Sequence, residues 1–345
     1  MHRISCPGDP ALTMTYPGFV FRTLRDRGYS EGALLAGTGL ESQQLEDPHF
    51  RSGFPPLRRL LLNAIEETGN PHLGVTLARG FLPTYIGLPA YAAMNAARFR
   101  DGLGVLERYF FLSFPAIDVR LDRLPGGAAT VRVRSRFPFG ELEYFGIGSA
   151  VVAIDGLLKA MLGSDRVTDR VDMAFGPPDG WSDIAPLIAF PVRFAAEKNL
   201  IVFDAGLLDQ PLPAADPLNH ARLTALCAQF AAEMRQASSP VEQVLAILSD
   251  AEPLNPSLTQ IAGSLGYSER SLRRHLERSG TTFRGILDSV RERRARALLT
   301  DSALPVKSIA AAVGFETPSN FARSFKRWTG LTPNAFRERA AGGRK

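Results

Sequence analysis

The chain has 345 residues, more than one ordinary hydrophobic core accommodates, so two or three domains are expected. Hydrophobic residues make up 45% and charged residues 22%, as in soluble globular proteins, and the longest apolar stretch, Phe145 to Leu162, carries two charges that argue against a membrane span. The net charge of +5 is uneven: residues 240–345 hold 17 Lys and Arg against 10 Asp and Glu, whereas the preceding residues hold 23 against 25. A basic excess confined to one segment is typical of a nucleic-acid-binding module.

The N-terminal part of the chain is predicted to be mainly helical. Residues 1–15 show no helical pattern, so they are predicted to be disordered or to precede a true start at Met14. A block of helices covers residues 16–79, and a longer helix is predicted from Phe99 to Ser113.

The pattern then changes to strands. Residues 117–122 and 131–137 alternate between apolar and charged side chains around a glycine turn, which predicts a β-hairpin with one buried face. The other face carries Arg132, Arg134 and Arg136, which either meet an acidic ligand or form a solvated strand face. With the apolar helix over 145–162, this segment is predicted to pack helices on a small sheet.

The proline-containing stretch from Leu212 to Pro217 marks the exit from this domain, which is therefore placed at residues 16–215. Residues 216–240 are predicted to form a linker helix. Its apolar residues recur three or four apart, at Leu223, Leu226, Phe230 and Met234. This stripe is either a dimer seam or a surface that packs on its own domain.

The last hundred residues contain a repeat. Ile261-Ala262 and Gly266-Tyr267 recur 48 residues later as Ile309-Ala310 and Gly314-Phe315. Leu272 and Leu276 recur 49 residues later as Phe321 and Phe325. A helix, a glycine turn and a second helix form a helix-turn-helix unit, so two units are predicted, at about 258–278 and 306–328. They lie within an all-helical domain at residues 241–340, followed by a tail at 341–345.

The second helix of each unit is the predicted DNA reader. Ser268 and Thr317 are its expected N-caps. Arg270, Arg273 and Arg274 project from the outward arc of the first reader, and Ser319, Asn320 and Arg323 from that of the second. Arginine pairs with guanine and asparagine with adenine in the major groove, whereas a lysine near the helix end is expected to meet phosphate.

One uninterrupted helix, Phe283 to Thr300, is predicted between the two units, with Ile286, Leu287, Val290, Ala297 and Leu298 facing inward. A helix of that length spans ~27 Å. Adjacent major-groove faces of B-DNA lie ~34 Å apart. A rigid helix can therefore hold both readers about one helical turn apart, which a flexible linker cannot do.

Residues 254–339 closely resemble the DNA-binding domain of the AraC/XylS family of bacterial transcription regulators. The strongest match is the string Val313-Gly314-Phe315, Phe325-Lys326-Arg327, Gly330, Pro333 and Phe336-Arg337. The resemblance implies that the six reader residues named above contact bases. We expect contacts to the DNA backbone from Ser268, Thr317, Lys326, Arg327 and Thr332. Pro318 departs from the long polar side chain of some members, which puts the base readout at that position in doubt.

The N-terminal half resembles the arabinose-binding-like sensor domain of one branch of that family, through Pro191-Val192-Arg193-Phe194 and the run from Leu207 to Pro213. The resemblance implies a small-molecule effector, dimerisation and contact with RNA polymerase. A dense aromatic cluster between residues 81 and 114 either lines an effector pocket or is ordinary core. The candidate pocket residues are Tyr85, Tyr91, Arg98, Tyr109 and Phe111.

Nothing in the sequence indicates an enzyme or a cofactor. The five histidines have no metal-ligand spacing, and no phosphate-binding loop or nucleophile elbow is present. The two cysteines, Cys6 and Cys227, are too few for a disulfide framework and are expected to be inert thiols. The sequence therefore predicts a cytoplasmic, homodimeric, effector-responsive activator that binds double-stranded DNA. The alternative is a repressor or architectural protein that binds DNA mainly through charge, without an effector.

Overall fold

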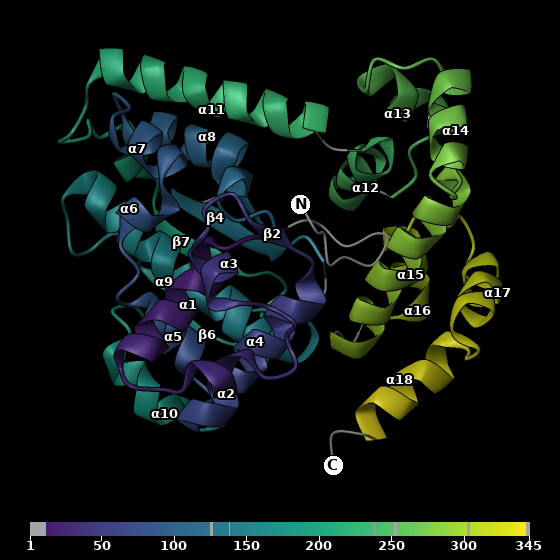
Figure 1. Ribbon diagram of the computed structural model, residues 1–345, viewed down its shortest axis with the longest axis horizontal. Coiled ribbons are helices and arrows are strands. Elements are labelled where there is room, and N and C mark those ends of the chain that lie inside the picture. The colour runs from purple at the N-terminus through teal and green to yellow at the C-terminus, as the bar shows by residue number, and fades with distance from the viewer. Residues whose placement is uncertain are drawn as a thin grey trace. The chain divides into compact units, whose positions relative to one another are not determined.

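The computed structural model describes residues 12–124, 127–137, 139–237, 239–251, 254–301 and 304–342. The chain divides into two compact units, drawn as ribbons in Figure 1. The first contains the chain up to Ser135 together with Glu141–Glu233, and the second contains Met234–Lys345 with the short segment Arg136–Gly140. Cys6, the rest of residues 1–11 and residues 343–345 of the predicted tail lie outside the described residues.

The first unit begins with a short sheet in which β1 (Leu12–Thr13) pairs antiparallel with β2 (Arg51–Ser52). Thr13 Oγ1 also donates a hydrogen bond to Ser113 O at 2.6 Å. The expectation that residues 1–15 lack structure is therefore wrong for Leu12 to Thr15, because a two-residue strand has no periodicity to detect. The helices that follow are α1 (Thr15–Asp26), α2 (Glu31–Leu35), α3 (Ser42–Glu46), α4 (Phe54–Thr68), α5 (Leu73–Ala78), α6 (Pro83–Ile86), α7 (Leu88–Met94) and α8 (Phe99–Tyr109).

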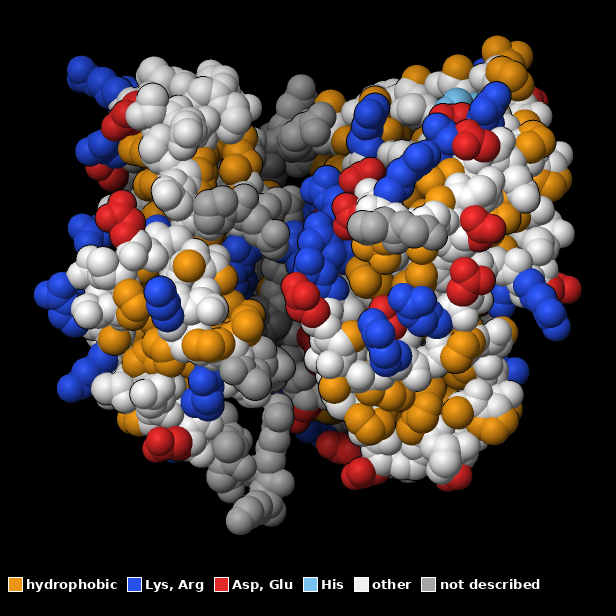
Figure 2. All heavy atoms as spheres, turned by 180° about the vertical axis from the view of Figure 1, so that it is seen from behind, with side chains coloured by type: hydrophobic (Ala, Val, Ile, Leu, Met, Phe, Trp, Pro, Cys, Tyr) orange, Lys and Arg blue, Asp and Glu red, His pale blue; other side chains and the backbone are white. Residues whose placement is uncertain are grey.

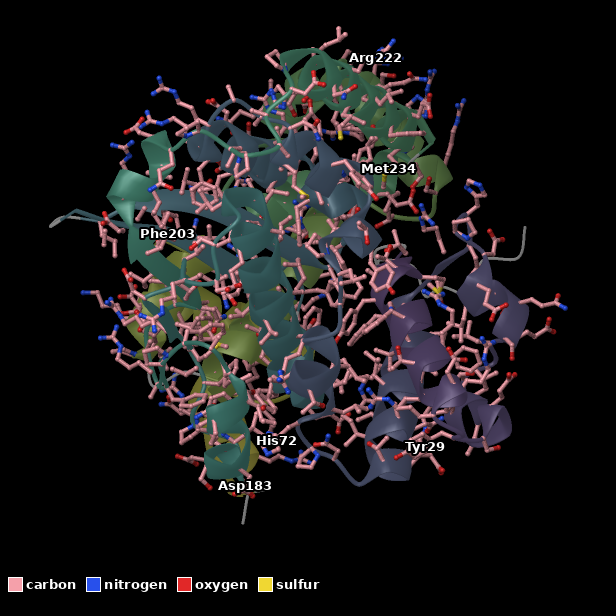
Figure 3. The ribbon with its side chains drawn as sticks, turned by 90° about the vertical axis from the view of Figure 1, so that its left-hand side faces the viewer. Tyr29, His72, Asp183, Phe203, Arg222 and Met234 are labelled. Carbon is pink, nitrogen blue, oxygen red and sulfur yellow. The ribbon has the colours of Figure 1, made fainter. Side chains whose placement is uncertain are left out.

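A five-stranded sheet forms the centre of this unit, in the order β3-β4-β7-β5-β6. Its strands are β3 (Ile117–Arg123), β4 (Ala128–Ser135), β5 (Arg170–Asp172), β6 (Val192–Arg193) and β7 (Leu200–Asp204), with the short helix α10 (Trp181–Ile184) before β6. The predicted hairpin is β3 and β4, in which Val119 lies opposite Val133. The apolar face packs on helices: Phe203, labelled in Figure 3, meets Phe99 of α8 edge to face with ring centroids 5.7 Å apart.

The opposite face of the hairpin carries paired charges. Arg134 Nη2 lies 3.3 Å from Asp118 Oδ2, and Arg132 Nε lies 3.8 Å from Asp122 Oδ2. The Asp118 side chain is only 3% exposed, so the arginine beside it neutralises a buried charge. These two arginines are thus engaged by carboxylates of the neighbouring strand, which neither interpretation of the sequence included.

The apolar helix α9 (Glu143–Leu162) crosses the first unit. Together with the preceding turn, Gly140–Leu162 is long enough to cross a membrane, and an 18-residue window within it has a mean hydropathy of 1.6. However, 61% of that window is buried inside the protein, and Lys159 Nζ lies 2.7 Å from Asp155 Oδ2, so these two charges pair with each other. The helix is therefore a buried core helix, as predicted from its sequence.

The predicted linker helix is α11 (Pro217–Ala237). His220 Nδ1 lies 2.9 Å from Ala92 O, and Cys227 and Ala231 are buried. Leu226 and Phe230 are instead 42% and 49% exposed, on a helix whose outer surface also carries Arg222, labelled in Figure 3. The apolar stripe seen in the sequence is therefore only partly used by the first unit.

The second unit is helical and contains two hydrophobic clusters. Its helices are α12 (Pro240–Asp250), α13 (Leu258–Ser264), α14 (Glu269–Arg278), α15 (Phe283–Asp301), α16 (Val306–Ala312), α17 (Pro318–Thr329) and α18 (Pro333–Gly342). The long helix α15 contributes Ile286 and Val290 to the first cluster and Ala295 and Leu299 to the second. The predicted inward residues Leu287 and Leu298 are only partly buried, and the Ala297 side chain lies outside the described residues.

Candidate nucleic-acid interface

The first helix-turn-helix unit is formed by α13 and α14. Ser257 caps α13 and Ser268 caps α14, and each hydroxyl oxygen accepts a hydrogen bond at 3.2 Å from the backbone N–H three residues ahead. Gly266 has a φ of +74°, and Tyr267 N donates to Ala262 O at 2.9 Å. Ala262 is buried where the two helices meet. The predicted capping serine and turn glycine are confirmed.

The second helix-turn-helix unit repeats this arrangement on α16 and α17. Thr317 Oγ1 accepts a hydrogen bond from Asn320 N at 3.3 Å, and Pro318 occupies the first position of α17. Gly314 has a φ of +78°. The apolar residues that form the small core of each helix-turn-helix unit are buried, apart from the half-buried Leu265; they are Ile261, Leu272, Leu276, Ile309, Val313, Phe321 and Phe325.

The predicted base-reading residues of the first helix-turn-helix unit lie on one exposed arc of α14. Arg270, Arg273 and Arg274 are all exposed. Glu269 Oε1 accepts a hydrogen bond from Arg273 Nη2 at 2.9 Å, and Thr259 Oγ1 of α13 donates to the other carboxylate oxygen at 2.8 Å. Arg270 and Arg274 make no ion pair with any described residue. Arg273 is thus held in place, whereas the other two arginines are available to a ligand.

The predicted base-reading residues of the second helix-turn-helix unit lie near the start of α17. Ser319, Asn320 and Arg323 are exposed, and Arg323 Nη2 donates to Asn320 Oδ1 at 2.5 Å. Two of the three side chains therefore form one donor and acceptor surface one helical turn long. Such a pair can present both a guanidinium and an amide to adjacent base edges.

The candidate backbone contacts surround these arcs. Lys326 and Arg327 are exposed in the last turns of α17, and Asp288 of α15 accepts a hydrogen bond from Arg327 Nη2 at 3.0 Å. Thr332 caps α18, with Oγ1 accepting a hydrogen bond from Ala335 N at 3.3 Å. The N-terminus of α18 offers backbone amides and a positive helix dipole to a phosphate.

Helix α15 connects the two helix-turn-helix units without a break over 19 residues, so it is ~28 Å long. Figure 1 shows it running between the two helix-turn-helix units. In Figure 2, Lys and Arg side chains project from the surface of the C-terminal unit, seen on the left. The ~28 Å length of α15 is comparable to the ~34 Å repeat of the B-DNA major groove.

The five candidate effector residues lie in different surroundings. Tyr85 is half exposed and contacts the rings of Phe19 and Phe81, whereas Tyr109 is buried in the core. Arg98 Nη1 lies 3.5 Å from Asp209 Oδ1. Tyr91 is 44% exposed on α7, and Phe111 lies in a short turn after α8. These contacts join Tyr85 to Phe19 and Phe81, and Arg98 to Asp209, and none of them joins two of the five candidate residues.

Three residues near the interface were not identified from the sequence as functional. The Glu269 carboxylate that holds Arg273 has a readable signal, because acidic and basic residues four apart meet on a helix. Asp288 lies 39 residues from Arg327, and Arg291 of α15 donates to carbonyl groups 37 and 23 residues away. No local pattern reports pairings at those separations.

Two helix-turn-helix units on a basic domain, in a chain that also carries a mixed α and β domain, define a DNA-binding transcription regulator. The family model described as the arabinose-binding domain of AraC transcription regulators matches residues 28–212, more than half of the chain, and a helix-turn-helix domain model matches residues 261–339. The chain therefore belongs to the AraC family of transcription regulators, and the predicted fold class is confirmed.

Relatives match over most of the chain. The ornithine utilization regulator of Pseudomonas aeruginosa is 27% identical over 327 residues, covering 95% of this chain and 96% of that protein. The regulator VirS of Mycobacterium tuberculosis is 27% identical over 289 residues, covering 81% and 82%. The crystal structure of the regulator CdpR from Pseudomonas aeruginosa is similar with a TM-score of 0.44 at 20% identity, over 93% of this chain and 96% of that one. These relatives are transcriptional regulators and not enzymes.

Proposed function

We propose that this chain is an effector-responsive activator that reads two neighbouring major-groove segments on one face of DNA. The observation that carries this proposal is the single unbroken helix α15 between two reader helices with exposed polar arcs. A rigid connector shorter than one DNA turn allows both readers to bind together. Because the second reader is already oriented in the folded domain, little further entropy is lost when it binds after the first.

Arg270, Arg273 and Arg274 are assigned to bases in one segment, and Ser319, Asn320 and Arg323 to bases in the other. Each good bidentate pair discriminates against a wrong base by about 1–3 kcal/mol. Lys326, Arg327 and the α18 N-terminus are assigned to phosphates. Ser268 and Thr317 accept N–H donors on their oxygens, so each hydroxyl retains its own proton to donate to a phosphate oxygen.

The finer features of the regulator are also proposals. The N-terminal unit belongs to a ligand-binding class of domain, so it is assigned a small-molecule effector, and ornithine is a reasonable first compound because one relative is named for its utilisation. The outer face of α11 is assigned to a homodimer. Activation through RNA polymerase and a cytoplasmic location are proposed by likeness to the family.

Selection from random double-stranded DNA with the purified full-length protein tests the proposed function. The expected product contains two short conserved segments about one helical turn apart. Arg323→Ala should then relax the preference at one base pair, whereas Lys326→Ala should weaken binding to all sequences alike. If selection enriches no sequence, or if Arg323→Ala weakens all sequences equally, the alternative of charge-driven architectural binding is favoured.

A further inference from the structure

Arg291, near the middle of α15, contacts both helix-turn-helix units through one guanidinium group. Its Nη2 donates to Leu254 O at 3.2 Å and to Gly314 O at 2.9 Å. Its Cζ also lies 4.7 Å from the centroid of the Phe315 ring, within range of a cation–π interaction. Burial lowers the pKa of this guanidinium, but arginine remains charged at any physiological pH.

The two carbonyl groups belong to different halves of the DNA-binding unit. Leu254 precedes α13 and is fully buried in the first hydrophobic cluster. Gly314 forms the turn of the second helix-turn-helix unit, and Phe315 packs on the second cluster. Arg291 therefore connects the segment just before the first helix-turn-helix unit to the glycine turn of the second, which positions the reader helix α17.

The halves touch closely at this point. A Cβ added to Gly314 would lie 1.9 Å from Leu254 O, a separation that no side chain allows. A Cβ added to Gly266, the equivalent glycine of the first unit, would have no neighbour within 4 Å. Gly266 is thus required for its backbone angle alone, whereas Gly314 also permits contact between the halves. Arg291 holds that contact from the side, because its Nη2 donates to a carbonyl group of each half.

We propose that Arg291 is a positioning residue that fixes the separation and rotation of the two reader helices, and thereby the half-site spacing that the protein accepts. This inference rests on the proposed function, because it requires that both readers bind DNA. Without the Arg291 bridge, each helix-turn-helix unit keeps its own buried cluster, but the geometry between the units relaxes. Binding to one segment then no longer places the other reader in its groove.

Arg294, one turn further along α15, provides a matched control. It donates through Nη1 to Ala251 O at 2.9 Å and through Nη2 to Ser249 O at 3.0 Å, both at the end of α12. Both carbonyl groups therefore precede the first helix-turn-helix unit. Replacing Arg294 removes two comparable hydrogen bonds, both to the end of α12.

The experiment measures binding of the full-length protein by fluorescence anisotropy to DNA from the selection described above. The duplexes carry both segments at the selected spacing, both segments with two base pairs inserted between them, or either segment alone. Wild-type protein should lose affinity on the order of tenfold or more when base pairs are inserted, because the two readers can no longer bind together.

Arg291→Met should weaken binding at the selected spacing by roughly tenfold, leave binding to each single segment within about twofold, and shrink the penalty for the insertion. Arg294→Met should leave the insertion penalty unchanged. Arg291→Lys keeps the charge but lacks the planar guanidinium that lies over the Phe315 ring while Nη2 donates to both carbonyl groups, so it should behave like Arg291→Met. It also serves as the second variant if the methionine variant does not fold.

An unchanged insertion penalty in a folded Arg291 variant overturns the inference while leaving the proposed function intact. The same holds if affinity for both single segments falls as much as affinity for the full site, because Arg291 is then only a folding residue. If wild-type protein shows no insertion penalty, the proposed function fails as well.

Discussion

Asp288 of the linker helix α15 accepts a hydrogen bond at 3.0 Å from Arg327 of the second reader helix α17. The Arg327 side chain is 58% exposed and the Asp288 side chain 24% exposed, so the pair lies at the edge of the proposed DNA surface. An arginine assigned to phosphate is therefore partly neutralised before DNA arrives.

Asp288→Asn is expected to raise DNA affinity a few-fold at low salt, equally for the selected site and for a scrambled duplex. The substitution removes a negative charge near DNA and releases Arg327, and an exposed ion pair of this kind contributes only about 0–1 kcal/mol to folding. Anisotropy titrations at two salt concentrations measure this change, with Asp288→Glu as the control that keeps the pair. Weaker binding by Asp288→Asn would show instead that the ion pair is needed to orient α17.

The two turn glycines should differ in their tolerance of alanine. Gly266→Ala introduces only an unfavourable positive φ, which costs about 1–2 kcal/mol. Gly314→Ala adds a clash with the Leu254 carbonyl to the same strain, and overpacking costs about 1–3 kcal/mol more. Native-state hydrogen exchange of the amides in α14 and α17 reports the free energy of opening in each unit. Equal losses in the two variants would contradict the close contact at Gly314.

Cys227 should be unreactive in the folded protein. Burial raises the pKa of its thiol to about 11, so almost no thiolate is present at pH 8. The folded state holds this proton more tightly than the unfolded chain, so the contribution of the thiol to stability falls as pH rises from about 9 to about 11. Alkylation of a Cys6→Ser variant at pH 8 should be slow in native buffer and fast in urea. Rapid labelling of the native protein would contradict the burial.

The outer face of α11 is expected to mediate dimerisation. Leu226 and Phe230 are exposed, so Leu226→Glu combined with Phe230→Glu should leave the fold intact while placing two charges in an apolar contact. Sedimentation velocity should show a dimer for the wild type and a monomer for the double variant. Gln229→Glu, also on an exposed position of α11, should remain dimeric. A double variant that sediments as the wild type does would place the dimer contact elsewhere.

The helix-turn-helix units were predictable because their signals are local. A capping residue, a turn glycine and inward apolar residues all lie within about twenty positions, and each is set by the geometry of a single turn or helix. The hairpin of β3 and β4 was predictable for the same reason, since alternation reveals a strand with one buried face.

Features that depend on distant parts of the chain were not predictable. Strand β1 exists because Leu12 pairs with Ser52, and the arginines on β4 are engaged by the neighbouring β3. Likewise, α15 packs on two clusters, and Ala295 and Leu299 are buried in the second of them, where a single helical stripe indicated Leu298. The proposed effector residues had no spacing rule at all, which is why their role stays a prediction.

The most direct test of the central claim is hydroxyl-radical footprinting of the full-length protein on its selected site. Two reader helices joined by α15 should protect two patches about one helical turn apart, both on the same face of the duplex. A single short protected patch, or two patches on opposite faces, would contradict the proposal that one rigid helix places both readers in adjacent major grooves.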